Sequence, residues 1–422
     1  MIYLIVGSLF LFLALGVPVA FSLAIVSVLG LIYMGGPADL VAIADISWSS
    51  TSEFLLVAIP LFILMSEIID VSGVGRDLFR GVERWMGGLP GGVAMSTVVA
   101  SAVFGAVSGT AVGVAAVMSS IAIPEMLKRN FSKEMASGTV AASSGLGMVI
   151  PPSLPLIVYG VVTETSIERL FYHSLKPGLI IVAIFCFYIF VMTWFTQKKI
   201  KATVTDEQQF TFLESIYKSL PIFLLIIAVL GSIYVGFATP TEAAAVGVFG
   251  ALLIAFFNRT LTLKKLYLAL YKTAHVSSML LIVMVAAMVF SYMLSVAQVP
   301  QNLTQMVVDA NLQPWLFMTI IMLLLFVLGF FLDAISVVLI SVPILFPSII
   351  AYGYDPVWFG VVLMVNMCFA VVTPPVGLCL YVVRDSVASL TLSHVIKGVI
   401  PYIILYTLSI ALFMMFPGLI IK

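Results

Sequence analysis

The chain has 422 residues, of which 62% are hydrophobic and only 9% are charged, and its mean hydropathy is +1.22. This composition lies far outside the usage of soluble proteins and predicts an integral membrane protein. Nineteen basic residues balance nineteen acidic ones, so there is no net charge that would suggest nucleic acid as a partner.

The chain opens with two apolar stretches separated at Gly16-Val17-Pro18, where a helix would break. It has no basic n-region and no small-residue cleavage site, so we expect a retained span and not a signal peptide. Next we predict an interfacial segment and then a span. After the span comes an interfacial helix that has three arginines at four-residue spacing on one face. These predicted elements are 2–15, 20–34, 35–52, 54–69 and 72–85.

Residues 91–126 are unusual for a single span, because small residues crowd them and the run breaks at Val107-Ser108-Gly109-Thr110. Two helical arms about this tip, each too short to cross ~30 Å of hydrocarbon, predict a re-entrant hairpin that reaches the middle of the membrane. The next apolar helix is interrupted by a second break at Ile150-Pro151-Pro152-Ser153. Two consecutive prolines remove two backbone donors, so this helix cannot be continuous.

A long span, 170–195, is followed by the most polar stretch of the chain, 196–214, which we predict to be the hinge between two halves. A pair of helices, 219–235 and 243–257, comes next. A basic stretch then precedes a further span, 276–297.

The pattern of the first half returns at an offset of 223 residues, the separation of Pro151 and Pro374. Two apolar arms break near Leu332-Asp333-Ala334-Ile335-Ser336, and a later run breaks at Thr373-Pro374-Pro375-Val376. In lipid, unpaired backbone groups are tolerated only where they line a protein-enclosed cavity or hold an ion, so the paired breaks indicate a transporter's binding site. A packing kink is the alternative, and the doubled, repeated prolines disfavour it. The remaining elements are 300–311, 315–350, 358–372, 376–383 and 395–416.

Basic loops set the orientation. The loops at 76–84, 128–133, 198–201 and 259–272 can all face the cytoplasm, because the predicted spans between them return the chain to the same side of the membrane each time. The first hairpin then enters from the cytoplasmic side and the second from outside. The two repeats are therefore predicted to be inverted, the architecture that allows alternating access around one central site.

We expect the two tips and the two breaks to meet at the midplane. Half-helix N-termini there offer partial positive charge to an anion, and exposed carbonyls with Ser, Thr and Asn oxygens suit Na⁺. The candidate substrate-binding residues are Ser108, Gly109, Thr110, Pro152, Ser153, Asp333, Ser336 and Pro375. The candidate Na⁺ ligands are Ser108, Ser143, Gly147, Ile150, Asp333, Asn366, Ala370 and Thr373.

Asp333 is the most informative of these residues, because a carboxylate at membrane depth is costly and by default coordinates a cation or takes a proton. The alternative is an N-cap for the second arm, and both roles can hold at once. Ser143 and Asn366, which are 223 positions apart, either add a ligand oxygen or bridge helices. Interfacial, interhelical or end-capping roles are predicted for Glu67, Glu242, His275 and the pair Arg384 and Asp385.

No GxSxG, HExxH or P-loop sequence occurs, so we expect no enzyme of familiar type and exclude ATP-driven pumping by this chain alone. Energy must come from an ion gradient or a partner. The three cysteines, Cys186, Cys368 and Cys379, lie in apolar runs without CxxC or Cys/His spacing, which argues against a disulfide framework or a zinc site.

Several stretches together make the chain resemble the large membrane subunit of a tripartite ATP-independent periplasmic (TRAP) transporter, over nearly its whole length. They are AIPLFILMSEIIDVSGVGRDL (58–78), AVSGTAVG (106–113), IPPSLPLIVYGVVT (150–163), FATPTEAAAVG (237–247), and FLDAISVVLISVPILFP through YDPVWFG to TPPVGLCLYV (331–382).

The resemblance implies a multi-pass, all-α protein of the bacterial inner membrane that imports small organic anions, often carboxylates or acidic sugars, with Na⁺ as the coupling ion. It also implies a periplasmic substrate-binding protein that delivers substrate, a small four-helix membrane subunit, contact with membrane lipid, and hairpins that move as an elevator against a scaffold. The expected division is scaffold 1–90, transport half 91–169, scaffold and arms 170–313, transport half 314–391 and a scaffold helix 392–422.

One departure from the family stands out. Members that carry dicarboxylates usually have Asn-x-Glu-x-Gly before TPP, whereas this chain has Asn366-Met367-Cys368-Phe369-Ala370, and Cys379 stands where Asn is common. The missing acidic residue argues against assuming a four-carbon dicarboxylate. Three other functions are alternatives. The first is a stand-alone ion-coupled anion transporter or exporter that works without a binding protein. The second is a channel, but the sequence shows no continuous polar stripe, and the third is a non-transporting scaffold, which would not need costly breaks at the midplane.

Overall fold

The structure is a computed structural model that describes residues 2–196 and 211–421, and within these ranges the chain forms helices joined by turns. Among the described residues, nine helices are long and apolar enough to cross a membrane. The predicted all-α, multi-span class is therefore confirmed. Most of the predicted hinge, at 197–210, lies outside the described residues.

The helices follow the predicted order closely. The first half contains α1 (Ile2–Ala14), α2 (Val19–Gly35), α3 (Val41–Ser52), α4 (Ala58–Ser72), α5 (Val74–Met86), α6 (Gly92–Ser108), α7 (Ala111–Lys128), α8 (Lys133–Ser144), the short η3 (Gly145–Met148), α9 (Leu154–Val162) and α10 (Ile167–Thr196). The second contains α11 (Phe212–Tyr234), α12 (Pro240–Phe257), α13 (Leu263–Val296), α14 (Val299–Asp309), α15 (Pro314–Phe331), α16 (Ala334–Ala351), α17 (Pro356–Ala370), α18 (Leu378–Ser386) and α19 (Leu392–Met415).

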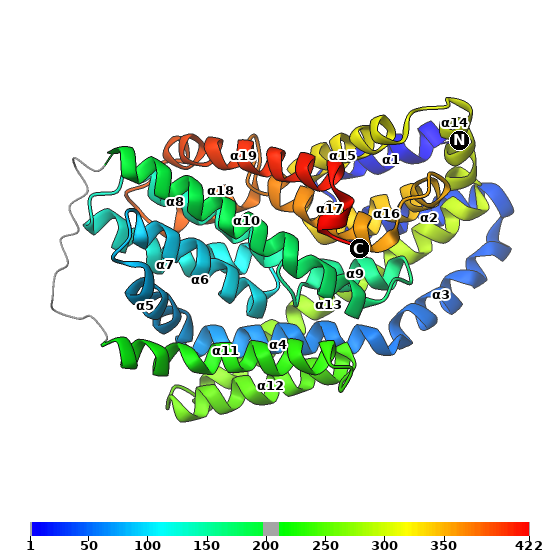
Figure 1. The fold of residues 1–422 in the computed structure, drawn as a ribbon. Coiled ribbons are helices and arrows are strands. Elements are labelled where there is room, and N and C mark those ends of the chain that lie inside the picture. Colours follow the sequence, from blue (N-terminus) through cyan, green and yellow to red (C-terminus); the bar gives the residue numbers. More distant parts are fainter. Residues whose placement is uncertain (1, 197–210, 422) are drawn as a thin grey trace.

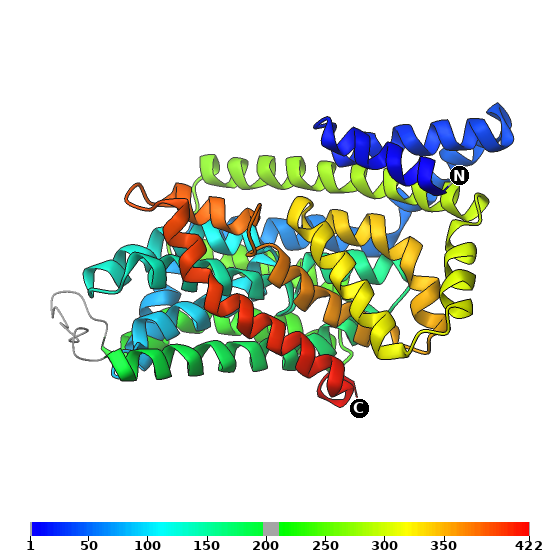
Figure 2. The same cartoon turned by 90° about the horizontal axis from the view of Figure 1, so that it is seen from above.

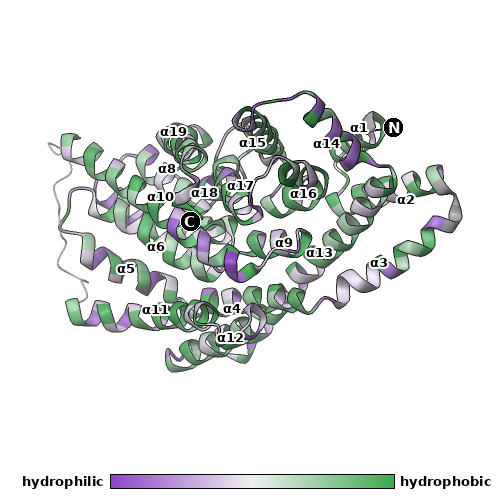
Figure 3. Ribbon diagram, turned by 45° about the vertical axis from the view of Figure 1, so that its right-hand side comes forward, coloured by the Kyte–Doolittle hydropathy of each residue, from purple (hydrophilic) through white to green (hydrophobic). Residues whose placement is uncertain are grey.

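The hydropathy of the ribbon explains why this order is stable in a membrane. Figure 3 shows hydrophobic residues along most of the helices, with hydrophilic residues gathered on α5, at the start of α11 and on α14. Local capping signals set the helix starts: Thr211 and Thr239 form capping boxes with Glu214 and Glu242. Glu242 is therefore an end group of α12, as predicted.

Corresponding helices of the two halves lie at the offset that separates the two Pro-Pro pairs. The first residues of α7 and α16, 111 and 334, differ by 223, and so do their last residues, 128 and 351. The first residues of α8 and α17, 133 and 356, differ by the same number. The same offset thus relates both the hairpins and the broken helices.

Helices of each half pack on helices of the other half. Helices α2 and α4 of the first half pack on α13 and α12 of the second, and α7 and α9 of the first half pack on α18 and α16 of the second. Figure 2 shows α13 as one long rod, with α1, α2 and α3 beside only its C-terminal part. In Figure 1, α11, α4 and α12 run side by side as a layer along one edge of the molecule.

Helix α19 is interlocked with α8 (Figure 1). A Cβ atom built on Gly138 would lie 2.2 Å from the carbonyl carbon of Gly398, so only glycines allow this approach of the two backbones. The hydroxyl groups of Thr139 and Tyr402 lie 2.7 Å apart at the same interface. Helix α10 likewise packs on α17. These contacts associate α10 and α19 with the broken helices, although the sequence placed both in the scaffold.

Two predictions about helix length were wrong. Both arms of the first hairpin were expected to be too short to cross, yet α7 has 18 residues and counts among the helices long enough to span, whereas α6 has 17 and does not. At 1.5 Å per residue α7 is ~27 Å long, close to the hydrocarbon thickness. Helix α13 begins at Leu263 and not at Val276, because the Thr262 hydroxyl caps it, so the basic residues after 263 lie on the helix.

Candidate functional site

The tip of the first hairpin lies against the first proline break. Gly109 ends α6 with φ +66, a left-handed conformation that glycine adopts readily. The Leu154 N–H donates to the Gly109 carbonyl at 3.3 Å. A Cβ atom on Gly109 would lie 3.2 Å from the Pro152 carbonyl oxygen and 3.3 Å from Leu154 Cγ. The first hairpin tip and the first proline break are therefore in direct contact, as predicted.

Two further glycines make this contact possible below the tip. A Cβ on Gly105 would lie 2.7 Å from the Gly147 Cα, and one on Gly147 would lie 3.0 Å from the Thr110 carbonyl. Sequence reasoning named Gly147 but missed Gly105, although a glycine in the middle of a predicted helix was a signal of close packing. The hydroxyls of Ser108 and Thr110 lie 3.3 Å apart at the tip, and Thr110 caps α7.

Within the first break, Ser153 connects its two sides. Its hydroxyl donates to the Met148 carbonyl at 2.6 Å and accepts the Leu156 N–H at 3.4 Å, so it is the N-cap of α9. Pro151 and Pro152 are joined by a cis peptide, and all residues from 148 to 153 are buried. The first break is a closed, internally bonded turn.

The second break is built differently. The Cys379 N–H donates directly to the Val371 carbonyl at 3.2 Å, without a bridging hydroxyl. Pro374 and Pro375 are also joined by a cis peptide, but Pro374 is only half-buried and Pro375 is exposed. The Thr373 hydroxyl donates to the Phe369 carbonyl at 2.6 Å.

At the second tip, Asp333 is the N-cap of α16. Its carboxylate accepts the N–H groups of Ile335 and Ser336 at 3.1 and 3.2 Å, and it also accepts the Ser336 hydroxyl. Asp333 is exposed at the surface of the described chain. The capping alternative is therefore confirmed, and a role as an ion or substrate ligand stays a prediction.

Ser143 and Asn366 both make interhelical bonds. Ser143 donates to the Ser101 hydroxyl of α6 at 2.9 Å, and the Asn366 amide nitrogen donates to the Met322 carbonyl of α15 at 2.9 Å. Each residue thus joins a broken helix to the first arm of its own hairpin. The bridging alternative is confirmed for both, and a role of either residue as a Na⁺ ligand stays a prediction.

The two broken helices touch each other just before their breaks. Cys368 Sγ donates to the Gly145 carbonyl at 2.9 Å, and these residues are 223 positions apart. The Tyr406 hydroxyl donates to the neighbouring Ala142 carbonyl at 2.9 Å. Equivalent positions of the two broken helices thus meet, and the first tip contacts the first break, whereas a meeting of both tips and both breaks stays a prediction. Asp333 and Ser336 make their hydrogen bonds within their own turn.

The other polar residues singled out from the sequence lie where predicted. Glu67 of α4 pairs with Lys272 of α13 at 3.1 Å, the ring of His275 stacks on Tyr271, and Arg384 pairs with Asp385 at 2.7 Å. A separate apolar groove of about 320 Å³ lies between α2, α3 and α13. None of the candidate site residues lines it, so it is not the predicted site.

Comparison with known proteins identifies a family that the chain matches over nearly its whole length. Residues 6–419 match the family described as "Tripartite ATP-independent periplasmic transporter, DctM component". The "Isethionate TRAP transporter permease protein DctMQ" of Oleidesulfovibrio alaskensis is 32% identical over 402 residues, which are 94% of this chain and 62% of that relative. This chain therefore spans less than two thirds of that protein.

Two other relatives are covered almost fully. The "C4-dicarboxylate TRAP transporter large permease protein DctM" of Pseudomonas aeruginosa is 31% identical, over 89% of this chain and 87% of that protein. The "Sialic acid TRAP transporter large permease protein SiaM" of Vibrio cholerae is 32% identical, over 98% and 96%.

Among solved structures, the Alcanivorax borkumensis YdaH transporter matches with a TM-score of 0.66 at 14% identity, over 91% of this chain and 90% of that one. Neisseria gonorrhoeae MtrF matches with a TM-score of 0.60 at 13% identity, over 97% and 94%. At these identities the likeness concerns the fold alone.

Proposed function

The chain belongs to the DctM component family of tripartite ATP-independent periplasmic transporters, and from this membership we propose that it imports a small organic anion together with Na⁺. It is a multi-pass transporter permease of the bacterial inner membrane and not an enzyme. The proposal concerns the substrate class, the coupling ion, the partners and the mechanism.

The observation that carries the proposal is the set of helices that begin at the tips and breaks. Helices α7, α9, α16 and α18 start at Ala111, Leu154, Ala334 and Leu378, each directly after a tip or a break. A helix N-terminus carries partial positive charge, which favours an anionic group. At α16 the Asp333 carboxylate already accepts two of the first N–H groups, so the other three helix starts are the better places for a bound anion. These ends are therefore the natural place for a carboxylate or sulfonate.

The same region supports a Na⁺ site by its donor set. The first tip and break supply hydroxyl and carbonyl oxygens from Ser108, Thr110, Gly147 and Ile150. Hard cations prefer such oxygen ligands. Asn366, Ala370 and Thr373 offer the counterparts in the second half, where the Ala370 carbonyl already accepts the Thr373 N–H at 3.1 Å. The residues present therefore fit a monovalent hard cation as a co-transported substrate.

The packing of each half on the other supports inverted repeats and an elevator mechanism. Because α19 interlocks with α8 and α10 packs on α17, we assign α6–α10 and α15–α19 to one moving body. The layer of α4, α11 and α12, together with α2 and α13, is the scaffold. This proposed division differs from the one expected from sequence, in which α10 and α19 belonged to the scaffold.

The residues near the second break favour an anion less polar than a four-carbon dicarboxylate. Cys368 and Cys379 are fully buried there, and the acidic residue of the dicarboxylate pattern is absent from 366–370. The named relatives carry isethionate, C4-dicarboxylates and sialic acid. Isethionate and sialic acid have one acidic group each, so we propose a substrate of that kind, delivered by a periplasmic binding protein to this chain and a small four-helix subunit.

Reconstitution tests this function. The permease, its small subunit and its binding protein are placed in proteoliposomes, and uptake of labelled isethionate, sialic acid and succinate is measured with an inward Na⁺ or choline gradient. We expect uptake of a monoacid that requires both Na⁺ and the binding protein. Equal uptake with choline would contradict Na⁺ coupling, and full uptake without the binding protein would favour a stand-alone transporter.

A further inference from the structure

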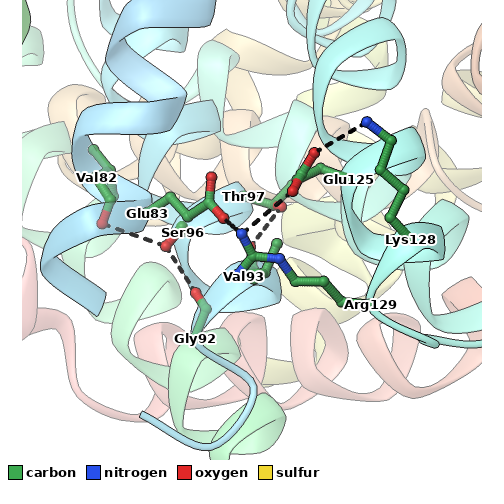
Figure 4. A network of polar contacts seen from close by, with 9 residues as sticks. All are labelled: Val82, Glu83, Gly92, Val93, Ser96, Thr97, Glu125, Lys128 and Arg129. Atoms are coloured by element: carbon green, nitrogen blue, oxygen red, sulfur yellow. Dashed lines mark hydrogen bonds and ion pairs between the residues drawn. The ribbon is translucent and has the colours of Figure 1, made fainter. Parts of the chain in front are cut away.

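The base of the first hairpin is joined to the interfacial helix α5 by a cluster of charges (Figure 4). Arg129, which follows the last residue of α7, pairs with Glu83 of α5 and also lies 3.3 Å from Glu125 on its own helix. The side chains of Arg129 and Glu83 are only 19% and 13% exposed. This burial distinguishes them from Lys128 on the same turn, whose side chain is 74% exposed.

The second half has a joint at the same positions. Ser348 and Tyr352 of the second hairpin stand 223 residues after Glu125 and Arg129. The Ser348 hydroxyl lies 2.8 Å from that of Thr304 on α14, and the Tyr352 hydroxyl donates to the Val307 carbonyl of α14 at 2.9 Å. Each interfacial helix is thus tied to the second arm of its hairpin at the position of Arg129 and Tyr352, by an ion pair in the first half and by a neutral hydrogen bond in the second. Ser348 adds a second neutral contact in the second half, whereas Glu125 supports Arg129 from its own helix.

Helix α5 is also fixed on its other face, to α11 of the scaffold. A Cβ on Gly81 would lie 1.9 Å from the Ser219 hydroxyl oxygen, so the two helices are in close contact. The Trp85 Nε1–H donates to the Ser215 hydroxyl at 2.9 Å. Helix α5 also packs on both arms of the hairpin, where a Cβ on Gly75 would lie 3.2 Å from Phe104 and from Val117. If the hairpin moves against the scaffold, either the α5–α11 contact around Gly81, here called the seam, or the contacts of α5 with the hairpin, which include the charged joint, must open.

The charged joint is the contact that can open at low cost, because each partner has a substitute on its own helix. Arg129 keeps Glu125 one turn away. Glu83 keeps Arg80, whose charge acts on the Glu83 carboxyl together with that of Arg129. Burial raises the pKa of Glu83, and the Arg129 and Arg80 charges act against that rise. The seam around Gly81 has no such substitute, since it depends on the close fit of Gly81 against the Ser219 side chain and the Ser215 carbonyl.

We propose that Glu83 and Arg129 form a latch that positions the first hairpin against the stationary helix α5 in this conformation and opens when the hairpin moves. This inference rests on the proposed elevator transport. The latch residues are positioning residues and do not touch the substrate. When the latch is open, Arg129 pairs with Glu125 and Glu83 pairs with Arg80.

A reversible cross-link tests the latch. Cysteines replace Glu83 and Arg129 in a Cys186→Ser background, and a bifunctional methanethiosulfonate joins them in proteoliposomes that contain the small subunit. Uptake of labelled isethionate, sialic acid or succinate, whichever the parent carries fastest with its binding protein, is measured before linking, after linking and after reduction. A matched pair, Trp85→Cys with Ser215→Cys, links the seam instead.

We expect at least a tenfold loss of uptake on linking 83 to 129, recovery after reduction, and less than a twofold change on linking 85 to 215. Uptake that survives the 83–129 link, or that both links block equally, would overturn the latch. Absence of uptake in the unlinked sample and in the parent would instead contradict the proposed function.

Charge exchange gives a second measurement that does not depend on cross-linking. Arg129→Gln and Glu83→Gln are each expected to lower uptake about fivefold, and the exchange Glu83→Arg with Arg129→Glu is expected to restore more than half of it. Lys128→Gln, on the same turn, should stay within twofold of the parent. If the exchange performs no better than the single variants, the two residues do not act as a pair.

Discussion

The two proline breaks have the same position in their halves and the same cis peptides, but they differ in how they are closed. In the first, the Ser153 hydroxyl stands between the Met148 carbonyl and the Leu156 N–H. In the second, the groups at the equivalent positions, the Val371 carbonyl and the Cys379 N–H, bond directly. The first break is buried throughout, whereas Pro375 of the second is exposed.

The hairpin tips differ in the same sense. The first tip has a left-handed Gly109 packed against Pro152 and Leu154, and the second has an extended Leu332 followed by an exposed Asp333. The two halves therefore share a backbone arrangement but differ in exposure. The tip and break of the first half are packed against each other, whereas Asp333 and Pro375 of the second half are exposed.

The largest effect is expected at the first tip. Gly109→Leu would place side-chain atoms against the Pro152 carbonyl and force a left-handed φ on leucine, so uptake in proteoliposomes should fall to the background of empty vesicles. Leu332→Gly, at the equivalent position of the second tip, should keep most of its uptake. Similar activities for the two variants would erase the proposed difference between the tips.

Asp333 should show the next largest effect. Asp333→Asn keeps a side-chain acceptor for the N–H groups of α16 but removes the charge, whereas Asp333→Ala also loses the cap, at a cost of ~1 kcal/mol. We expect both to abolish Na⁺-driven uptake while assembly with the small subunit persists. Uptake by Asp333→Asn with the parent's Na⁺ dependence would leave Asp333 with the capping role alone.

The first break should be more sensitive than the second to its hydroxyl. Ser153→Ala leaves the buried Met148 carbonyl without its side-chain donor, a loss of ~1–3 kcal/mol, and should lower the thermal unfolding temperature of the detergent-solubilised complex. Val376→Ser, the equivalent change in the second half, should leave that temperature unchanged within error. An equal shift in both variants would contradict the difference in closure.

The smallest effects are expected for the two interhelical bridges. Ser143→Ala removes one bond to Ser101, and Asn366→Ala removes one bond to the Met322 carbonyl, each worth ~0.5–1.5 kcal/mol. If Asn366 also serves Na⁺ through its amide oxygen, its variant should additionally raise the Na⁺ concentration for half-maximal uptake severalfold. Ser143→Ala provides the matched control, and equal Na⁺ dependence in both would restrict Asn366 to bridging.

Much of this architecture could be predicted from the sequence, because Pro-Pro pairs, Gly-rich tips and apolar runs are local signals. The 223-residue offset, for example, follows from two proline pairs alone and reappears in the bounds of α7 and α16. The contact of Cys368 with Gly145 and the interlock of Gly138 with Gly398 could not be predicted in the same way. They depend on how separate helices cross, and a glycine or cysteine in an apolar run does not say which helix it meets.

The central claim is that the paired discontinuities hold Na⁺ and an organic anion. Cysteines at Leu332 and Val376, in a Cys186→Ser background, report on this region through their rate of modification by a hydrophilic maleimide, with Ala388→Cys in an exposed loop as the control. We predict that Na⁺, but not choline, slows modification at 332 and 376 and leaves 388 unchanged. Equal rates in Na⁺ and choline at both positions, in protein that still shows Na⁺-driven uptake, would contradict the placement of the site.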